Sequence, residues 1–216
     1  MIKAKKAVVA VVAAVLAEWT AGTARANFTL VGSQELTVNT VHAEGWVCHQ
    51  SKAWIATGGS VSYLYAYDTS TANICGGTAC LLAYHTSTVN ISSGSVPSIS
   101  AYDTSTMNIS GGTVIDLRAY NASTITVNAR DIGVHGGLSL NGDKVVGTGI
   151  LSGKWFDGTA WAVNISQNDA SATIRVVPEP ATLSLLALGG LALIRRHSGR
   201  TRGQQAVCLC VPGKPD

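Results

Sequence analysis

Between Ala66 and Val127 the chain alternates apolar and polar residues in short runs that recur at a nearly constant spacing. The phrase reads AYDTSTANI from Ala66, AYHTSTVNI from Ala83, AYDTSTMNI from Ala101 and AYNASTITV from Ala119, so the starts lie 17, 18 and 18 residues apart. Within each repeat the apolar positions are two residues apart, which is the period of a strand and not of a helix. A short period without a helical pattern indicates stacked β-strands, one turn of a coil per repeat.

Aligning the repeats produces four apolar columns, which predict two strands per turn with alternate residues pointing into one shared core. The columns are Leu64, Leu81, Ile99 and Leu117; Ala66, Ala83, Ala101 and Ala119; Ala72, Val89, Met107 and Ile125; and Ile74, Ile91, Ile109 and Val127. The inward spacings do not follow multiples of six, which argues against a left-handed hexapeptide helix. The pattern predicts an all-β fold: a short, right-handed or flattened β-solenoid of 17–18-residue rungs over residues 58–131.

Two further columns predict the corners of the coil. Glycines at 59, 77, 94 and 112 predict a turn between strands, because glycine adopts positive φ at little cost. At the opposite corner stand Asp68, His85, Asp103 and Asn121. Short polar side chains at such a position can hydrogen-bond their own backbone.

The two regions that flank the repeats keep strand-like alternation but lose the phrase. Residues 27–57 are expected to hold one or two degenerate rungs, with Trp46 and Trp54 covering the open end of the core. In residues 132–176, Asn141-Gly142 and Asp157-Gly158 are dipeptides favoured in tight hairpin turns. We therefore expect two hairpins that pack on the last rung as a C-terminal β-hairpin cap.

Positive and negative charges are distributed unevenly along the chain. The whole chain carries a formal charge of +3, but residues 27–177 hold six Lys/Arg against nine Asp/Glu, a balance of −3. The basic excess therefore lies at the two ends. Nucleic-acid binding needs a clustered basic surface on the folded part, so a nucleic-acid partner is not expected.

The first 26 residues have the layout of a secretory signal peptide. Lys3, Lys5 and Lys6 precede the apolar run 7–17, and Ala24-Arg25-Ala26 places small residues before a cut at Asn27. The alternative is a membrane anchor, but the apolar run is too short to span about 30 Å of hydrocarbon. The signal helix is expected to be removed on export.

At the other end, Val177-Pro178-Glu179-Pro180 leads into the apolar run 181–194 and then Arg195-Arg196. We expect this region to be a membrane anchor that is short for a permanent span. It combines an extended segment flanked by prolines, a short hydrophobic helix and two arginines that stop the helix at the membrane surface. Residues 177–196 resemble the PEP-CTERM sorting domain, also called the ice-binding protein C-terminal domain. The resemblance implies export, transient membrane anchoring through this helix, and processing at the Pro-Glu-Pro segment by an exosortase-type transpeptidase. Such proteins are typical of Gram-negative bacteria that make exopolysaccharide and biofilm.

The chain departs from this pattern after the arginines. PEP-CTERM proteins usually end a few residues further on, whereas this sequence continues through residues 197–216 as a polar tail with Gly and Pro, expected to be disordered. If the extension blocks processing, the protein stays tethered to the membrane.

A row of tyrosines is the first candidate for binding. Tyr67, Tyr84, Tyr102 and Tyr120 occupy one outward column, where strand stacking would place them about 4.8 Å apart. Such a row could bind the faces of sugar rings in an exopolysaccharide. The alternative, which we favour, is that the tyrosines pack on each other and stabilise the sheet.

Threonine and asparagine form two other outward rows. Thr71, Thr88, Thr106 and Thr124 align without interruption, a regularity that resembles β-helical ice-binding proteins, although threonine is frequent in any exposed strand. Asn73, Asn90 and Asn108 are most simply a side-chain amide ladder, interrupted by Thr126.

Catalytic and covalent chemistry is weakly represented. Asp68 and Asp103, with Asp116 and Asp131, could form a calcium site or the acid pair of a polysaccharide lyase, but His85 separates the two corner aspartates. Cys75 and Cys80 flank Gly76-Gly77 and could form a disulfide across the turn in an oxidising compartment. No cofactor or metal site is indicated.

We therefore expect an exported, non-catalytic β-solenoid at the cell surface or in the biofilm matrix. The alternatives are a polysaccharide lyase or hydrolase on a β-helix, or an ice- or carbohydrate-binding solenoid.

Overall fold

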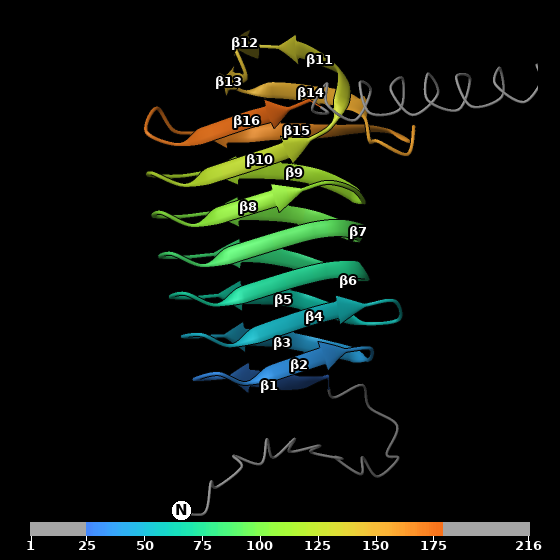
Figure 1. The fold of residues 1–216 in the computed structure, drawn as a ribbon, viewed down its shortest axis with the longest axis vertical. Helices are drawn as coiled ribbons and strands as arrows, with labels where there is room; N and C mark the ends of the chain where they lie inside the picture. The colour runs from blue at the N-terminus through green and yellow to red at the C-terminus, as the bar shows by residue number, and fades with distance from the viewer. Residues whose placement is uncertain (1–24, 179–216) are drawn as a thin grey trace, which may run out of the picture.

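A computed structural model describes residues 25–178, which form a β-solenoid of about six turns with no helix among them (Figure 1). The strands are β1 (Ala26–Leu30), β2 (Glu35–Val38), β3 (Val41–Val47), β4 (Lys52–Ala56), β5 (Ser60–Ala66), β6 (Thr71–Ala83), β7 (Thr88–Ala101), β8 (Thr106–Ile109), β9 (Thr113–Ala119), β10 (Thr124–Asn128), β11 (Arg130–Gly136), β12 (Ser139–Asn141), β13 (Lys144–Val146), β14 (Gly149–Lys154), β15 (Ala160–Asn168) and β16 (Thr173–Val177). The predicted signal helix and C-terminal hydrophobic helix lie outside the described residues. Within residues 25–178 no helix is long and apolar enough to cross a membrane.

The solenoid is flattened into two layers whose strands run across its long axis (Figure 1). One layer, the tyrosine sheet, consists of β1, β3, β5, the C-terminal half of β6, the C-terminal half of β7, β9 and β15, each parallel to the next. The other, the threonine sheet, consists of β2, β4, the N-terminal halves of β6 and β7, β8, β10 and β16, also parallel throughout. Because β6 and β7 bend through a corner, the two layers are one hydrogen-bonded system.

The predicted register of the repeats is confirmed. Leu64 pairs with Leu81, Leu81 with Ile99, and Ile99 with Leu117, so the column is a single file of buried side chains. On the facing sheet Ala72, Val89, Met107 and Ile125 pair in the same way and are fully buried. Alternate residues of both sheets therefore meet in one continuous apolar core.

At the N-terminal end, β1–β4 stack in parallel below the repeats. The two tryptophans do not cover the core as expected. Trp46 pairs with Tyr65 and Trp54 with Asn73, so the register places both indoles in outward columns. The end of the core is instead contacted by Phe28 and Leu36, which are only partly buried.

At the C-terminal end both predicted hairpin turns are present. β12 and β13 pair antiparallel around Asn141-Gly142, and β14 and β15 around Asp157-Gly158. The fold differs from a simple hairpin cap because β15 also pairs parallel with β9, and β16 with β10. These two strands form the last turn of the solenoid, and only β11–β14 leave it as an inserted unit.

Candidate functional site

The tyrosine ladder, formed by Tyr67, Tyr84, Tyr102 and Tyr120, stands on the outer surface of the tyrosine sheet where each strand enters a corner. Successive ring centroids are 4.9, 4.8 and 4.7 Å apart, with interplanar angles of 9°, 4° and 2°. Each tyrosine N–H donates to the alanine or valine carbonyl one turn below, which holds the four rings in register. The rings are half-buried.

This stacking determines what the ladder can offer to a ligand. Both faces of Tyr84 and Tyr102 are covered by neighbouring rings, so a sugar ring cannot stack on them. What remains accessible is a row of ring edges and hydroxyl groups. Burial, followed by the neighbouring tyrosines, raises the pKa of Tyr84; burial likewise raises the pKa of Tyr67. The hydroxyls of Tyr67 and Tyr84 are therefore protonated hydrogen-bond donors at neutral pH.

Three more aromatic residues extend the ladder towards the N-terminus: Tyr63 and Tyr65, which the repeat alignment did not predict, and Trp46, which was expected over the open end of the core instead. Tyr65 stacks on Trp46 at 5.7 Å, and lies 6.4 Å from both Tyr63 and Tyr67. The alternation within β5 carries the signal, because positions 63, 65 and 67 fall on one face of a strand. The aromatic surface thus reaches from β3, which carries Trp46, to the end of β9, where Tyr120 follows.

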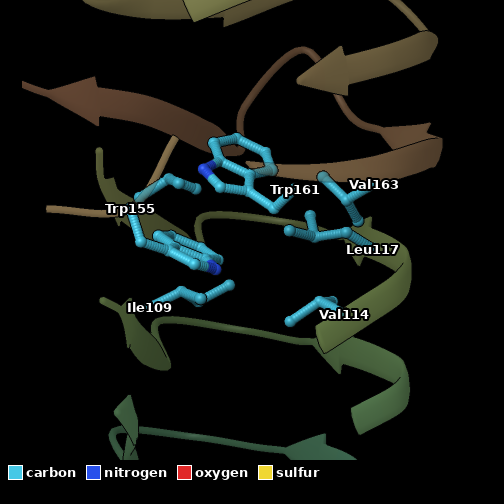
Figure 2. A pocket seen from close by; sticks show the side chains of 7 residues that line it. Ile109, Val114, Leu117, Trp155, Trp161 and Val163 are labelled. Carbon is cyan, nitrogen blue, oxygen red and sulfur yellow. The ribbon is translucent and has the colours of Figure 1, made fainter. Parts of the chain in front are cut away.

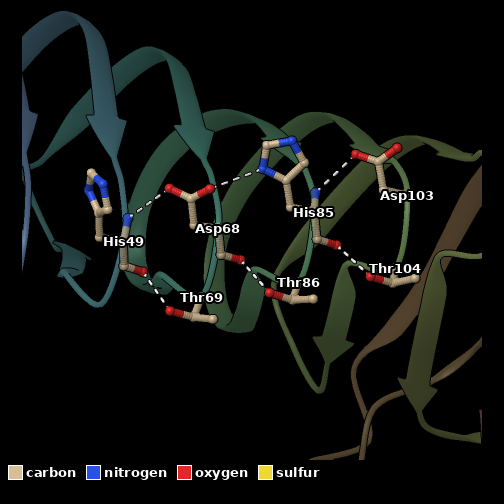
Figure 3. Close-up of polar contacts among 7 residues, drawn as sticks. All are labelled: His49, Asp68, Thr69, His85, Thr86, Asp103 and Thr104. Atoms are coloured by element: carbon tan, nitrogen blue, oxygen red, sulfur yellow. Dashed lines mark hydrogen bonds and ion pairs between the residues drawn. The ribbon is translucent and has the colours of Figure 1, made fainter.

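A second ordered feature is the polar corner, the column His49, Asp68, His85, Asp103 and Asn121. All five residues have left-handed φ, between 53° and 59°. The predicted bonds to their own backbone are not what the structure shows. Asp68 accepts a hydrogen bond from the His49 N–H at 3.3 Å and lies 3.2 Å from His85 Nδ1, so its carboxylate links three successive turns (Figure 3).

The threonines of the corner repeat the same linkage. The hydroxyls of Thr69, Thr86 and Thr104 donate to the carbonyls of the turn below, at 3.0, 2.9 and 3.0 Å (Figure 3). Asp103 accepts from the His85 N–H at 3.1 Å and from Asn121 Nδ2 at 3.4 Å. The corner is therefore a hydrogen-bonded column parallel to the solenoid axis.

The acidic residues singled out in the sequence do not converge. The turn that carries His85 separates Asp68 from Asp103. Asp116 pairs with Arg118 at 2.8 Å, and Asp131 with Lys154 at 3.1 Å, on other parts of the fold. Among residues 25–178 no three His, Cys, Asp or Glu side chains are grouped so that they could hold a metal ion.

The outer surface of the threonine sheet is built from two straight rows. Thr71, Thr88, Thr106 and Thr124 pair in register. Beside them, Asn90 Nδ2 donates to Asn73 Oδ1 at 2.9 Å and Asn108 Nδ2 to Asn90 Oδ1 at 3.0 Å, which confirms the predicted amide ladder. These bonds consume much of the hydrogen-bonding capacity of the asparagine row.

The cysteines lie on outward positions. Cys75 is exposed, Cys80 is partly exposed, and both are free thiols in the structure. They stand on opposite sides of the corner at Gly76-Gly77, Cys75 in the threonine sheet and Cys80 in the tyrosine sheet. A Cys75–Cys80 disulfide stays a prediction.

One apolar cavity lies where the inserted unit meets the last turns. Trp155 and Trp161 stack at 4.8 Å over Ile109, Val114 and Leu117 (Figure 2). Its volume of about 10 Å³ leaves space for about one water molecule, and Trp155 Nε1 donates to the Gly112 carbonyl at 3.0 Å. This cavity is a small packing gap between the inserted unit and the core, and it is too small for a substrate.

The sorting segment continues directly from the solenoid. Val177 is the last residue of β16 and Pro178 follows it; Glu179, Pro180, Arg195 and Arg196 lie outside the described residues. Residues 176–200 match the family model of the PEP-CTERM protein-sorting motif. Comparison with curated proteins and with solved structures yielded no match.

Motif and fold together define a class, the exported β-solenoid. The chain carries a PEP-CTERM signal, which implies sorting by an exosortase and a transient membrane anchor.

Proposed function

We propose that this protein is a non-catalytic structural component of the cell surface or biofilm matrix, delivered there through its PEP-CTERM signal. The observation that carries the proposal is the regularity of its outer surfaces. Tyrosine, threonine and asparagine rows repeat from turn to turn. The tyrosine rings stack on their counterparts in adjacent turns, and the asparagine side chains hydrogen-bond theirs. Such surfaces suit extended contacts with other polymers in a matrix.

The arrangement of acidic groups supports the non-catalytic part of the proposal. A lyase or hydrolase requires a cleft in which at least two acids or bases converge on one bond. In residues 25–178 the corner aspartates link successive turns by hydrogen bonds, and Asp116 and Asp131 pair with basic neighbours. To test this, the purified exported protein is incubated with exopolysaccharide from the producing organism. We expect no new reducing ends and no absorbance from unsaturated sugars; either signal would favour the enzyme.

We further propose that exopolysaccharide is the partner and that it contacts the tyrosine ladder along the solenoid axis. Because the ring faces are covered, hydroxyls and ring edges would make the contacts. Replacing Tyr84 and Tyr102 with Phe keeps the stack and removes two hydroxyls, so retention on immobilised exopolysaccharide should fall several-fold. Replacing Asn90 and Asn108 with Gln on the other sheet is the matched control. Unchanged retention of the folded Phe variant would restrict the ladder to a structural role.

Delivery can be tested in the cell. Replacing Pro178-Glu179-Pro180 with three alanines should leave the protein in the membrane fraction, whereas the native chain should reach the surface or matrix fraction. Alanines at residues 213–215 of the tail provide a control that leaves the motif intact. If both variants reach the matrix equally, sorting does not depend on the motif. Thermal hysteresis by the exported protein would instead assign ice binding to the threonine row.

A further inference from the structure

The two ends of the solenoid are closed differently. At the C-terminal end β13 pairs antiparallel with β16, and β14 with β15, so the last turn is covered by the inserted unit (Figure 1). At the N-terminal end no strand within residues 25–178 pairs with the outer side of β1 or β2. One end of the stack therefore has two strand edges with free hydrogen-bonding capacity.

The backbone direction of these edges follows from the bonds they already make. The carbonyls of Leu30 and Gln34 accept from Cys48 and Lys52 of the next turn. Because successive residues of a strand direct their backbone groups to opposite sides, Thr29 and Thr37 direct their N–H and C=O groups towards the open side. Neither group has a partner among the residues that the structure describes.

The edges also lack the usual protection against pairing. Natural edge strands are commonly blunted by lysine, proline or a bulge. β1 reads ANFTL, without proline or a charged side chain; after the predicted cleavage its charge is the new amino terminus at Asn27, at the far end of the strand from Leu30. β2 reads ELTV, whose only charge is Glu35. That carboxylate pairs with Lys52 at 3.1 Å, so repulsion between two such edges is small. Phe28 and Leu36 leave apolar surface partly uncovered beside them.

The chain itself offers little to cover this end after export. The predicted cleavage before Asn27 falls within β1, which begins at Ala26. The segment after residue 178 is attached to β16, at the opposite end of the solenoid. Signal-peptide removal would thus create an amino terminus at the edge strand itself.

We propose that the N-terminal end binds a second copy of this chain. Its two edge strands belong to two sheets and are held at the spacing of the core, so a lone peptide strand would satisfy only one of them. A two-fold rotation brings β1 against its copy and β2 against its copy, both antiparallel, and joins the two cores. The interface is isologous, and the capped C-terminal ends stop growth at a dimer.

The test uses the exported, signal-cleaved protein. Sedimentation velocity over a wide concentration range should show a monomer–dimer equilibrium with no larger species. In the dimer, the Thr29 and Thr37 amides should exchange with deuterium more slowly as concentration rises. Replacing both threonines with Pro removes the outward N–H groups without touching the bonds of Leu30 and Gln34 and should weaken dimerisation at least tenfold.

Replacing the same two threonines with Val is the matched control, because it keeps the backbone donors; it should dimerise like the native protein. Thermal unfolding confirms that each variant is folded. A monomer at every concentration, or a dimer unaffected by the two prolines, would overturn the proposal. Open-ended fibres would show that the C-terminal cap does not block pairing and would also overturn it.

Discussion

The two corners of the solenoid solve the same problem, reversing the strand direction, by different means. The polar corner uses residues with side chains in left-handed conformations and fixes them with hydrogen bonds to adjacent turns. The other, the glycine corner, is formed by residues 58–59, 76–77, 93–94 and 110–112. It has no comparable ladder of side-chain carboxylates, and its backbone strands approach one another closely.

The comparison shows where the fold tolerates change. The inserted unit enters between β10 and β15, at the glycine corner. The polar corner continues across that insertion, because Asp169 accepts from the Asn121 N–H at 3.2 Å although 48 residues separate them. We infer that the polar corner maintains the register of the turns, while the glycine corner accommodates differences in length.

The largest effect is expected at Gly94, whose φ is +98°. A Cβ there would lie 2.3 Å from the Gly77 carbonyl oxygen, a backbone atom that cannot move aside. Gly94→Ala should lower the free energy of unfolding by about 3 kcal/mol or more, from clash plus backbone strain. Gly32→Ala is the control, since Gly32 also has positive φ (+69°) but nothing within 4 Å of the added atom. It should cost about 1 kcal/mol. Equal losses in urea denaturation would contradict the role given to close packing.

A smaller loss is expected in the polar corner. Asp103→Ala removes the acceptor of the His85 N–H and places alanine at φ +57°, which should cost about 2 kcal/mol. Asp103→Asn keeps an acceptor and a residue that tolerates this conformation, so it should lose less than about 1 kcal/mol. Chemical denaturation measures the series. If alanine and asparagine were equivalent, the hydrogen bonds between turns would not maintain the corner.

The tyrosines beside the polar corner predict a pH dependence. Burial raises the pKa of Tyr84 above its ordinary value near 10, so the unfolded chain loses this proton at a lower pH than the folded protein. The stabilisation is complete below about pH 10 and is lost as pH rises through the folded pKa. Melting temperatures between pH 9 and 12 should fall less steeply for Tyr84→Phe than for the native protein. Parallel slopes would argue against a buried phenol.

The smallest effect is expected just inside the polar corner, where buried serines form a column. Ser70, Ser87, Ser105 and Ser123 are fully buried, and their hydroxyls have no hydrogen-bond partner among residues 25–178. Ser87→Ala should change the free energy of unfolding by less than about 0.5 kcal/mol, because it removes an unpaired polar group, and Ala172 already occupies this position in the last turn. Ser51→Ala, which removes a 2.6 Å bond to the Cys48 carbonyl, should cost about 1 kcal/mol and serves as the contrast.

The repeated part of the fold could be predicted because inward positions recur in one register. The Leu64–Leu117 column and the asparagine ladder follow directly from stacking equal turns. The glycine column predicts positive φ at four positions, and this is correct for two of them. Gly94 and Gly112 have positive φ, but Gly59 and Gly77 do not: a Cβ there would meet the carbonyl oxygens of Val38 and Ala56. Close approach between turns, which depends on three-dimensional packing, is invisible in a repeat alignment.

The last turn was not predicted as part of the solenoid because the inserted unit separates it in the sequence from the turn before it. β15 and β16 follow β9 and β10 by about 48 residues instead of 18, and Asp169-Ala170-Ser171 replaces the usual corner phrase. The similarity of Thr173-Ile174-Arg175-Val176 to Thr124-Ile125-Thr126-Val127 was the remaining signal. The apolar–polar alternation of β15 and β16 is compatible with a hairpin and with a turn of the solenoid. Their parallel pairing with β9 and β10, which are distant in the sequence, makes them a turn of the solenoid.

The junction at Val177 has a geometric consequence for the anchored protein. β16 belongs to the last turn and ends one residue before Pro178, so the membrane-bound segment is attached at one end of the stack with no intervening spacer. From β1 to β15 the tyrosine sheet contains six strand-to-strand spacings of about 4.8 Å each, which place the first turn roughly 30 Å from that attachment. Before processing, β1 and β2 are therefore the strands that can reach furthest from the lipid surface, and Trp46 on β3 lies one turn closer to it.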